Sequence, residues 1–196
     1  MPTSSTQISK LLPTLFQRFD AEQGLTVFHV GAALPETVDF FSDYRCKLHF
    51  IDVLSALPLD TGEDASASRR QQLQALLTFP QDTRFDLCLF WDLFNFLDSD
   101  TLKTFLSVLQ PYLKASAVAH AFSVHNRKLP QLNHIYGIKH KDTLKVRNRR
   151  STPPGYAPHS QRELTALLGC FQVERSVLLP DSRLELLLHR QHTPQE

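Results

Sequence analysis

Short apolar runs alternate with amphipathic segments along most of the chain, and this alternation predicts strands that alternate with helices. Continuous apolar runs of this length are typical of parallel strands that are buried on both faces. They cover residues 25–30, 48–53, 85–91 and 117–124. Near the C-terminus, residues 171–179 and 184–189 flank a turn that contains Pro and Asp, which predicts an antiparallel hairpin.

Between these strands, apolar residues recur at helical spacing. The first amphipathic segment begins at Ile8 and is predicted to form one helix that ends near Gly24. Later segments carry recognisable starts, since proline favours the first helical position and Ser followed by Glu three residues later forms a capping box. These starts are Pro35, the end of a loop at residues 59–68, the capping residue Ser99, and the pair Ser160 and Glu163.

The composition fits one domain that covers residues 1–196. A chain of 196 residues with 42% hydrophobic residues can bury a substantial core but is short for two domains. Cys46, Cys88 and Cys170 are far apart and lack C-x-x-C spacing, so we expect neither a disulfide framework nor a metal site. The sequence has no apolar run of about 20 residues and no secretory leader pattern, so we expect a cytoplasmic protein without a membrane span.

A basic insertion at residues 127–157 interrupts the alternation of strands and helices. Residues 127–150 hold eight Lys or Arg and one Asp, a charge of +7, which leaves −6 for the remainder of a chain with net charge +1. Apolar periodicity fades in this stretch, so the sequence predicts an irregular or partly ordered segment.

The charge of the insertion indicates a surface for polyanions. With Tyr136 and Tyr156 within or beside it, a basic strip of this kind suits an acidic protein surface or a nucleic acid. A solvated loop without a partner is the alternative that the charge pattern leaves open. The candidate partner-binding residues are Lys139, Lys141, Lys145, Arg147, Arg149 and Arg150.

Four stretches of the sequence carry a family resemblance: TVFHVGAALPET, KLHFIDV, FDLCLFWDLFNFLDSDTLKTFLSVLQPYLK and PHSQRELTALLGCFQVERSVLLPDSRLELLLHR. In order, they resemble the first strand with its glycine loop, the second strand with its terminal acid, the fourth strand with its helix, and the closing helix and hairpin of the class I S-adenosylmethionine (SAM) dependent methyltransferases. The resemblance implies an α/β fold with a doubly wound, mostly parallel sheet, helices on both faces and a C-terminal antiparallel hairpin. The space between Val53 and Phe85 looks too short for the third strand of that family.

The glycine loop departs from the family's pattern of an acid followed by three alternating glycines. The aligned residues are His29, Gly31, Ala33 and Pro35. The resemblance assigns Gly31 and Ala33 to the backbone that approaches SAM. However, Pro35 lacks a backbone N–H, and the imidazole of His29 stands where the family has a carboxylate acceptor. Gly31 also has a structural explanation, because glycine permits the turn between a strand and a helix.

Residues at two strand ends are the remaining cofactor candidates. Asp52 ends the run at residues 48–53, where the resemblance implies a carboxylate that accepts hydrogen bonds from ribose hydroxyls. The same position would serve NAD, but a G-x-G-x-x-G loop is absent. Trp91 and Asp92 end the run at residues 85–91, at the rim from which this family presents residues to methyl donor and acceptor. The structural alternatives are a turn residue for Asp52, packing for Trp91 and a helix cap for Asp92.

These observations favour a methyltransferase-like protein that has weakened or lost SAM use and acts as an interaction module through the basic insertion. The alternative is an active SAM-dependent methyltransferase with an atypical cofactor loop, because methyl transfer depends mainly on positioning a reactive sulfonium. SAM is therefore a candidate cofactor, no metal is expected, and the sequence assigns no catalytic residue.

Overall fold

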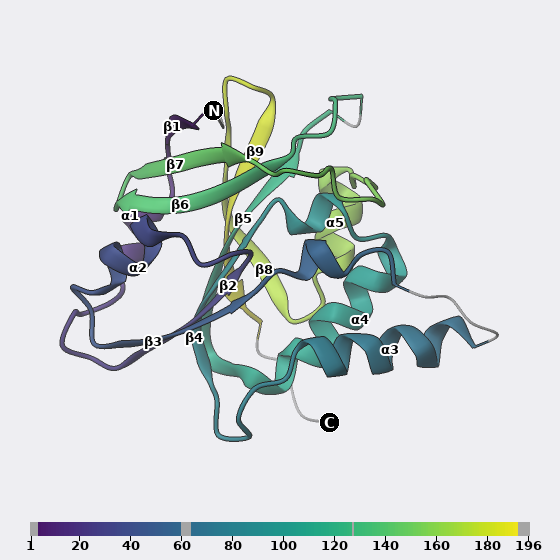
Figure 1. Cartoon of the computed structure of the whole chain (residues 1–196), viewed down its shortest axis with the longest axis horizontal. Helices are drawn as coiled ribbons and strands as arrows, with labels where there is room; N and C mark the ends of the chain where they lie inside the picture. Colours follow the sequence, from purple (N-terminus) through teal and green to yellow (C-terminus); the bar gives the residue numbers. More distant parts are fainter. Residues whose placement is uncertain (1–3, 60–63, 127, 192–196) are drawn as a thin grey trace.

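The computed structural model describes residues 4–59, 64–126 and 128–191, and Figure 1 shows strands between two groups of helices. The strands are β1 (Ser4–Ile8), β2 (Leu25–Val30), β3 (Cys46–Ile51), β4 (Phe85–Trp91), β5 (Leu113–Val124), β6 (His134–His140), β7 (Thr143–Asn148), β8 (Phe171–Leu178) and β9 (Arg183–Arg190). The α-helices are α1 (Leu12–Phe16), α2 (Pro35–Phe41), α3 (Ala65–Leu76), α4 (Ser99–Leu109) and α5 (Gln161–Leu167). Short 3-10 helices are η1 (Val53–Ala56), η2 (Leu93–Asn95) and η3 (Gln110–Tyr112).

A six-stranded sheet with the order β3-β2-β4-β5-β9-β8 forms the centre of the fold. Strands β3, β2, β4 and β5 are parallel, whereas β9 runs antiparallel to both β5 and β8. The predicted doubly wound sheet and its C-terminal hairpin are therefore confirmed. Between η1 and β4, the described residues contain no strand, as the short spacing predicts, and β3 is consequently an edge of this sheet.

Alternate side chains of β4 enter two separate hydrophobic cores. Cys88 and Phe90 pack with residues of α3, α4 and α5 on one face of the sheet. Leu87 and Leu89 pack with residues of α1 and α2 on the other face, and Figure 1 shows the two groups of helices on opposite sides of the strands. Burial on both faces explains why β4 is continuously apolar from Leu87 to Trp91 rather than alternating.

Two of the predicted helix starts are confirmed. Helix α2 begins at Pro35, and Ser160 and Glu163 form the expected capping box at the start of α5. Helix α3 begins at Ala65, so the predicted loop at residues 59–68 ends earlier than expected. Residues 60–63 of that loop lie outside the described part of the chain.

The start of α4 differs by one residue from the prediction. Asp98, rather than Ser99, is the capping residue, and its carboxylate accepts a hydrogen bond from the backbone N–H of Thr101 at 2.8 Å. Asp and Ser are both favourable in this position, so the local sequence alone does not choose between them.

The N-terminal segment is a strand followed by a short helix, so the prediction of one helix from Ile8 to Gly24 is wrong. Strand β1 pairs antiparallel with β7, with Ser4 opposite Arg147 and Ile8 opposite Thr143. Only the five residues of α1 form an α-helix in this segment. Pairing with a distant strand has overridden the local helical spacing.

The described part of the basic insertion contains regular β structure, so the prediction of an irregular segment is wrong for residues 134–148. Strands β6 and β7 form an antiparallel hairpin, and β1 joins β7 to complete a three-stranded sheet. Arg127, the first residue of the insertion, lies outside the described residues. The buried side chains of the hairpin follow the period of two that a half-buried strand requires; they are Tyr136, Ile138, Leu144 and Val146.

A buried carboxylate ties the N-terminal segment to the central sheet. Glu185 of β9 accepts hydrogen bonds from the backbone N–H of Lys10 at 2.8 Å and of Leu11 at 3.2 Å, and from the hydroxyl of Ser9. Its fourth partner is the His120 imidazole, at 2.8 Å. Burial opposes ionisation, but these bonds, led by the one with His120, outweigh it and lower the pKa of Glu185 to about 2. The carboxylate therefore stays charged and holds the connection between β1 and α1 in place.

Candidate functional site at the carboxyl ends of the strands

The candidate cofactor residues lie at the carboxyl ends of three neighbouring strands. Gly31 follows β2 and Asp52 follows β3. Trp91 is the last residue of β4, and Asp92 follows it. Open α/β sheets bind ligands at this edge, where the strand order reverses. Ala33 is exposed in the loop that leads from Gly31 to α2. The fold thus brings the sequence-predicted residues to one edge, as expected.

Gly31 makes the turn between β2 and α2. Its φ is +119°, a region that side-chain-bearing residues rarely adopt. Its N–H donates a hydrogen bond to the Ile51 carbonyl at 2.8 Å, which is the last bond between this loop and β3. A side chain at this position would approach the Nη2 atom of Arg149 at 4.0 Å. A residue of the basic insertion therefore lies directly over the glycine loop.

Arg149 occupies both oxygens of Asp52. Its guanidinium donates two hydrogen bonds to the carboxylate, at 2.9 and 3.1 Å, and the Ser55 hydroxyl donates a third at 2.6 Å. Burial raises the pKa of Asp52, but the bonds from Arg149 and Ser55 outweigh burial and lower it overall. The carboxylate is ionised, and its acceptor capacity is largely used within the chain.

His29 is a buried, neutral acceptor. Its Nε2 atom accepts a hydrogen bond from the indole N–H of Trp91 at 3.1 Å, so the single proton of the neutral ring is on Nδ1. Burial lowers the pKa of His29 to about 3. His29, which stands in place of the family's acid, thus holds the Trp91 side chain at the end of β4.

Trp91 has an unusual backbone conformation. Its φ is 51°, in the left-handed region that bulky residues rarely adopt, at a shift in the register between β4 and β5. The indole stacks on the Tyr136 ring with centroids 5.2 Å apart and an interplanar angle of 20°. Strained residues of this kind gather at functional sites, where the surrounding structure holds them in place.

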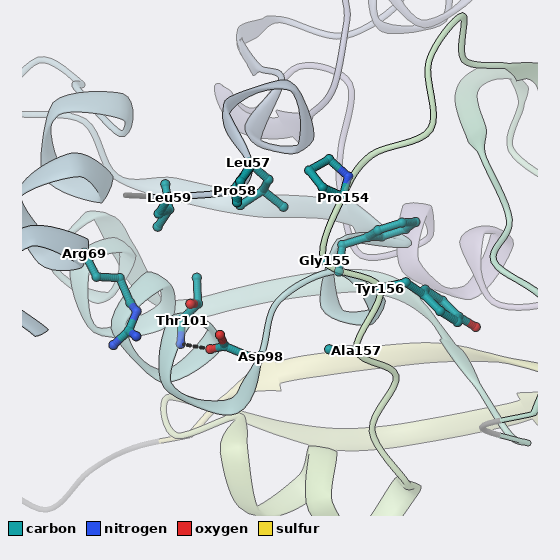
Figure 2. Close-up of a pocket in the computed structure, with 11 residues that line it drawn as sticks. Leu57, Pro58, Leu59, Arg69, Asp98, Thr101, Pro154, Gly155, Tyr156 and Ala157 are labelled. Carbon is teal, nitrogen blue, oxygen red and sulfur yellow. Dashed lines mark hydrogen bonds between the residues drawn. The ribbon is translucent and has the colours of Figure 1, made fainter. Parts of the chain in front are cut away.

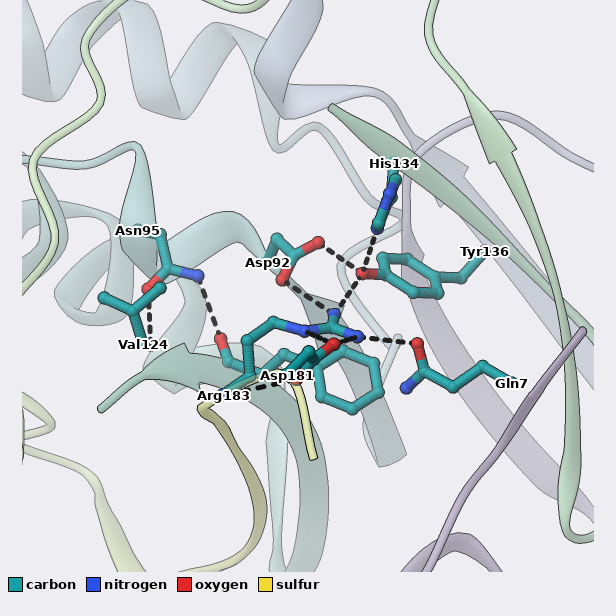
Figure 3. A network of polar contacts seen from close by, with 9 residues as sticks. Gln7, Asp92, Asn95, Val124, His134, Tyr136, Asp181 and Arg183 are labelled. Atoms are coloured by element: carbon teal, nitrogen blue, oxygen red, sulfur yellow. Dashed lines mark hydrogen bonds and ion pairs between the residues drawn. The ribbon is translucent and has the colours of Figure 1, made fainter. Parts of the chain in front are cut away.

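Asp92 belongs to a buried polar network that Figure 3 shows. The Tyr136 hydroxyl donates a hydrogen bond to Asp92 at 2.5 Å, and the Arg183 guanidinium donates to the Tyr136 oxygen at 2.6 Å. Arg183 also bonds Asp181 at 2.7 Å and the Gln7 side chain at 2.6 Å. Burial raises the pKa of the Tyr136 hydroxyl well above its usual range, so this group keeps its proton and donates to Asp92. The network joins β1, the residue after β4, β6 and the start of β9.

The space over the strand ends is almost filled. A cavity of about 10 Å³ remains between Gly31, Trp91, Tyr136 and Arg149. This volume holds roughly one water molecule. Tyr136 and Arg149, both from the basic insertion, fill the space next to the glycine loop.

Contacts with α2 hold the hairpin in this position. Arg147 forms a two-point ion pair with Glu36, and the backbone N–H of Ile138 donates to the Thr37 hydroxyl at 3.1 Å. Gly137 allows this approach, since a side chain there would lie 3.2 Å from the Leu34 Cδ1 atom. The bond from Arg147 is the main cause that lowers the pKa of Glu36. The first turn of α2 and strand β6 are therefore packed against each other.

The predicted partner-binding residues divide into two groups. Arg147 and Arg149 are engaged in ion pairs within the chain. The other four, within the described part of the chain, have no ion-pair partner, and all but the half-buried Lys145 are exposed; they are Lys139, Lys141, Lys145 and Arg150.

Sequence reasoning did not find three residues of the site: Tyr136 as a packing residue, Arg183 and Glu36. The alternation of Tyr136 with Ile138 is the signal that predicts a strand, but the basic residues around it obscured this pattern. In residues 4–59, 64–126 and 128–191, no helix is long and apolar enough to cross a bilayer. The same residues contain no group of three or more His, Cys, Asp or Glu that could hold a metal ion.

Several solved structures that are similar to this chain are methyltransferases. One is 1,6-didemethyltoxoflavin-N1-methyltransferase from Burkholderia thailandensis with bound S-adenosylhomocysteine, with a TM-score of 0.52 and 13% identity over 93% of this chain and 78% of that one. Another is a candidate type 11 methyltransferase from Sulfolobus solfataricus, with a TM-score of 0.52 and 15% identity over 97% of both chains. The PH0226 protein from Pyrococcus horikoshii OT3 aligns with a TM-score of 0.53 and 12% identity over 92% of this chain and 88% of that one.

No protein-family model and no curated protein sequence matches the chain. The similarity to solved structures, at these low identities, concerns the fold. The chain has a class I methyltransferase-like fold, with the expected sheet order and C-terminal hairpin.

Proposed function

We propose that this chain is a methyltransferase-like domain that has lost the use of SAM and acts as an interaction module. The observation that carries the proposal is the ion pair between Arg149 and Asp52. It places a guanidinium of the chain itself on the carboxylate that, by the family resemblance, would receive a ribose. A nucleoside could bind Asp52 only after both hydrogen bonds from Arg149 had been broken and the carboxylate had accepted bonds from the ribose instead.

The filled strand ends support the same proposal. Pockets for small organic ligands usually span roughly 300–1,000 Å³, whereas the cavity beside Gly31 has about 10 Å³. Tyr136 stacks on Trp91 and is bonded to Asp92, so moving it exposes a buried polar network as well as an aromatic ring. SAM binding would therefore have to displace the hairpin from several buried contacts at once.

An active methyltransferase with an atypical loop is the second candidate. One similar structure, the Burkholderia thailandensis enzyme, contains S-adenosylhomocysteine, and this favours SAM as the ligand if the strand ends do open. In that case the β6–β7 hairpin would be a lid, and the pairs of Arg147 and Arg149 would break on binding. The two candidates therefore differ in whether the hairpin leaves the strand ends.

Calorimetric titration of the intact chain with SAM and S-adenosylhomocysteine separates the candidates. We expect no saturable heat, and no rise in melting temperature at millimolar ligand, because stabilisation appears only when ligand exceeds its dissociation constant. A dissociation constant in the low micromolar range for either compound would overturn the loss of SAM use. Arg149→Ala is the informative companion, since it removes the guanidinium from Asp52 without altering the central sheet.

The basic insertion is the proposed contact surface. Lys139, Lys141 and Arg150 are exposed and carry their charge to solvent, and Lys145 is half-buried on β7. Because the rest of the chain carries −6, a polyanion would be attracted mainly to this hairpin. An acidic protein surface and a nucleic acid both fit this charge, and they differ in how binding depends on salt.

A four-residue variant tests the surface without disturbing the closed site. Replacing Lys139, Lys141, Lys145 and Arg150 with Gln leaves the ion pairs of Arg147 and Arg149 intact. The matched control replaces Arg45, Lys47, Lys103 and Arg162, four exposed cations outside the insertion. Affinity for RNA or DNA should fall in the first variant only, with a log–log salt slope that becomes shallower by up to about four.

An acidic protein partner would give a different pattern. Its capture would also weaken in the hairpin variant, but its affinity would fall with salt through screening and steering rather than along the linear log–log line of counterion release. If the hairpin variant retains every partner that the control retains, the insertion is a solvated surface and the interaction proposal fails.

A further inference from the structure

An open pocket of about 410 Å³ lies outside the closed site. It is bounded by the turn after η1, by α3, by the start of α4 and by the loop before α5, as Figure 2 shows. None of Gly31, Asp52 and Asp92 lines it. Its volume falls in the range of small-ligand pockets, in contrast to the filled space beside the glycine loop.

Apolar side chains form most of the pocket wall. Leu57, Pro58, Leu59 and Pro154 lie along one side of it in Figure 2. The Phe96 ring contributes a flat surface and is held edge-on by Tyr156, with ring centroids 5.6 Å apart. A wall of this kind suits the face of a planar ligand, because aromatic and proline rings lose little freedom on contact.

The polar groups of the pocket are concentrated on a second side. Arg69 reaches in from α3, and Asp98 and Thr101 belong to the start of α4 (Figure 2). Among residues 4–59, 64–126 and 128–191, Arg69 has no ion-pair partner. Asp98 is fixed by its hydrogen bond from the Thr101 N–H at 2.8 Å, so its position does not depend on a ligand. A guanidinium only donates and a carboxylate only accepts, so this side offers both functions with no net charge.

We propose that this pocket binds a neutral, planar molecule whose polar edge carries both a carbonyl acceptor and an N–H donor, as carboxamides and lactams do. The carbonyl accepts from Arg69, the N–H donates to Asp98, and the flat body lies against Phe96 and the prolines. A carboxylate would meet Asp98, and an ammonium would meet Arg69, so each charged analogue loses one of the two contacts and gains a repulsion.

Three probes with the same ring test the proposal: benzamide, benzoate and benzylamine. Each is titrated into the intact, ¹⁵N-labelled chain, and the backbone amide signals of Thr101, Gly155 and Ala157 report on the pocket. We expect saturable shifts of these signals with benzamide, and an affinity at least about tenfold lower for either charged probe, since a lost charge-assisted contact is worth about that factor. Binding of all three probes with equal affinity, or no saturable shift with benzamide, would overturn the proposal.

Two variants and a control assign the polar contacts. Arg69→Met should weaken benzamide binding about tenfold, whereas Arg70→Met should leave it unchanged. Arg70 is the neighbour on α3, and it donates to the Ser107 hydroxyl rather than lining the pocket. Asp98→Asn keeps a residue that can cap α4 but removes the charge, so it should weaken benzamide less and reduce the discrimination against benzoate. Unchanged benzamide affinity in the folded Arg69→Met and Asp98→Asn variants would show an apolar crevice without the proposed recognition.

Discussion

Arg149 donates two hydrogen bonds to Asp52, at 2.9 and 3.1 Å, across 97 positions of sequence. This pair joins the end of the basic hairpin to the end of β3. Both side chains are partly buried, with exposed fractions of 10% for Arg149 and 29% for Asp52. The pair is therefore the direct link between the insertion and the strand end at which the family resemblance expects a cofactor.

A double-mutant cycle with Asp52→Asn and Arg149→Met should give a coupling energy of about 1–2 kcal/mol in the free energy of unfolding. We expect this value because two hydrogen bonds join the side chains and both are partly buried. Amide exchange in β6 and β7 should accelerate in Arg149→Met, whereas exchange in β4 should not. Arg150→Met, an exposed neighbour, serves as the control. A coupling energy near zero with unchanged exchange would mean that the pair does not hold the hairpin.

Tyr136→Phe should destabilise the chain by about 1–3 kcal/mol in urea denaturation. The substitution keeps the ring on Trp91 but removes the hydroxyl that bonds Asp92 and Arg183, so a buried carboxylate loses a donor. Tyr156→Phe is the matched control, since its hydroxyl bonds the Leu129 carbonyl at 3.2 Å from a half-buried position. Equal effects of the two changes would contradict the importance of the network around Asp92.

Gly137→Val should cost about 1–3 kcal/mol of unfolding free energy, because a branched side chain would press on Leu34 and Glu36 of the α2 region. Gly24→Val makes the same chemical change where no atom lies within 4 Å of the added Cβ. We expect that control to stay within about 0.5 kcal/mol of the parent chain. A tolerated valine at position 137 would show that α2 and the hairpin are not closely packed in solution.

The buried imidazole of His29 should make stability fall as the pH falls below about 6.5. In the folded chain its pKa is lowered from 6.5 to about 3, whereas the unfolded chain binds a proton near the ordinary value. Between these values the unfolded state binds more protons, so the free energy of unfolding decreases by up to about 1.4 kcal/mol for each unit of pH. The contribution of neutral His29 to the free energy of unfolding is complete above pH 6.5 and is lost as the pH falls toward 3.

Urea denaturation at about pH 7.5 and about pH 5 measures this dependence. His29→Gln keeps a hydrogen-bond acceptor for Trp91 and removes the titrating group, so the loss of stability between the two pH values should shrink. His125→Gln changes an exposed histidine and should leave the loss as it is in the parent chain. The same pH dependence in His29→Gln and the parent would exclude His29 as its source.

The central sheet could be predicted because its signals are local. The apolar run of β4, the proline that starts α2 and the capping box of Ser160 and Glu163 each depend on a few neighbouring residues. The edge position of β3 also follows from a local fact, the short spacing between Val53 and Phe85. The elements that such short patterns predict are present in the folded chain because packing in the cores on both faces of the sheet favours the same elements.

The contacts that fill the strand ends could not be predicted, because they join residues that are distant in sequence. Arg147 and Glu36 are 111 positions apart, and β1 pairs with a strand that begins at Thr143. Ile8 fits a helical pattern with the residues after it, and only the pairing with β7 makes it part of a strand. The basic side chains of the hairpin indicated a surface, but which of them point inward to an acid depends on the folded contacts.

The pairing of β1 with β7 also constrains the order in which parts of the chain can fold during synthesis. Ser4 to Ile8 must wait for residues 143–147 before the small sheet exists. On the ribosome, β2, β3 and β4 emerge before β6 and β7, so Gly31, Asp52 and Asp92 are synthesised before Tyr136 and Arg149. Contacts of such long sequence separation form late in folding. The carboxyl ends of β2, β3 and β4 therefore stay uncovered in the nascent chain until residues 134–149 have been added.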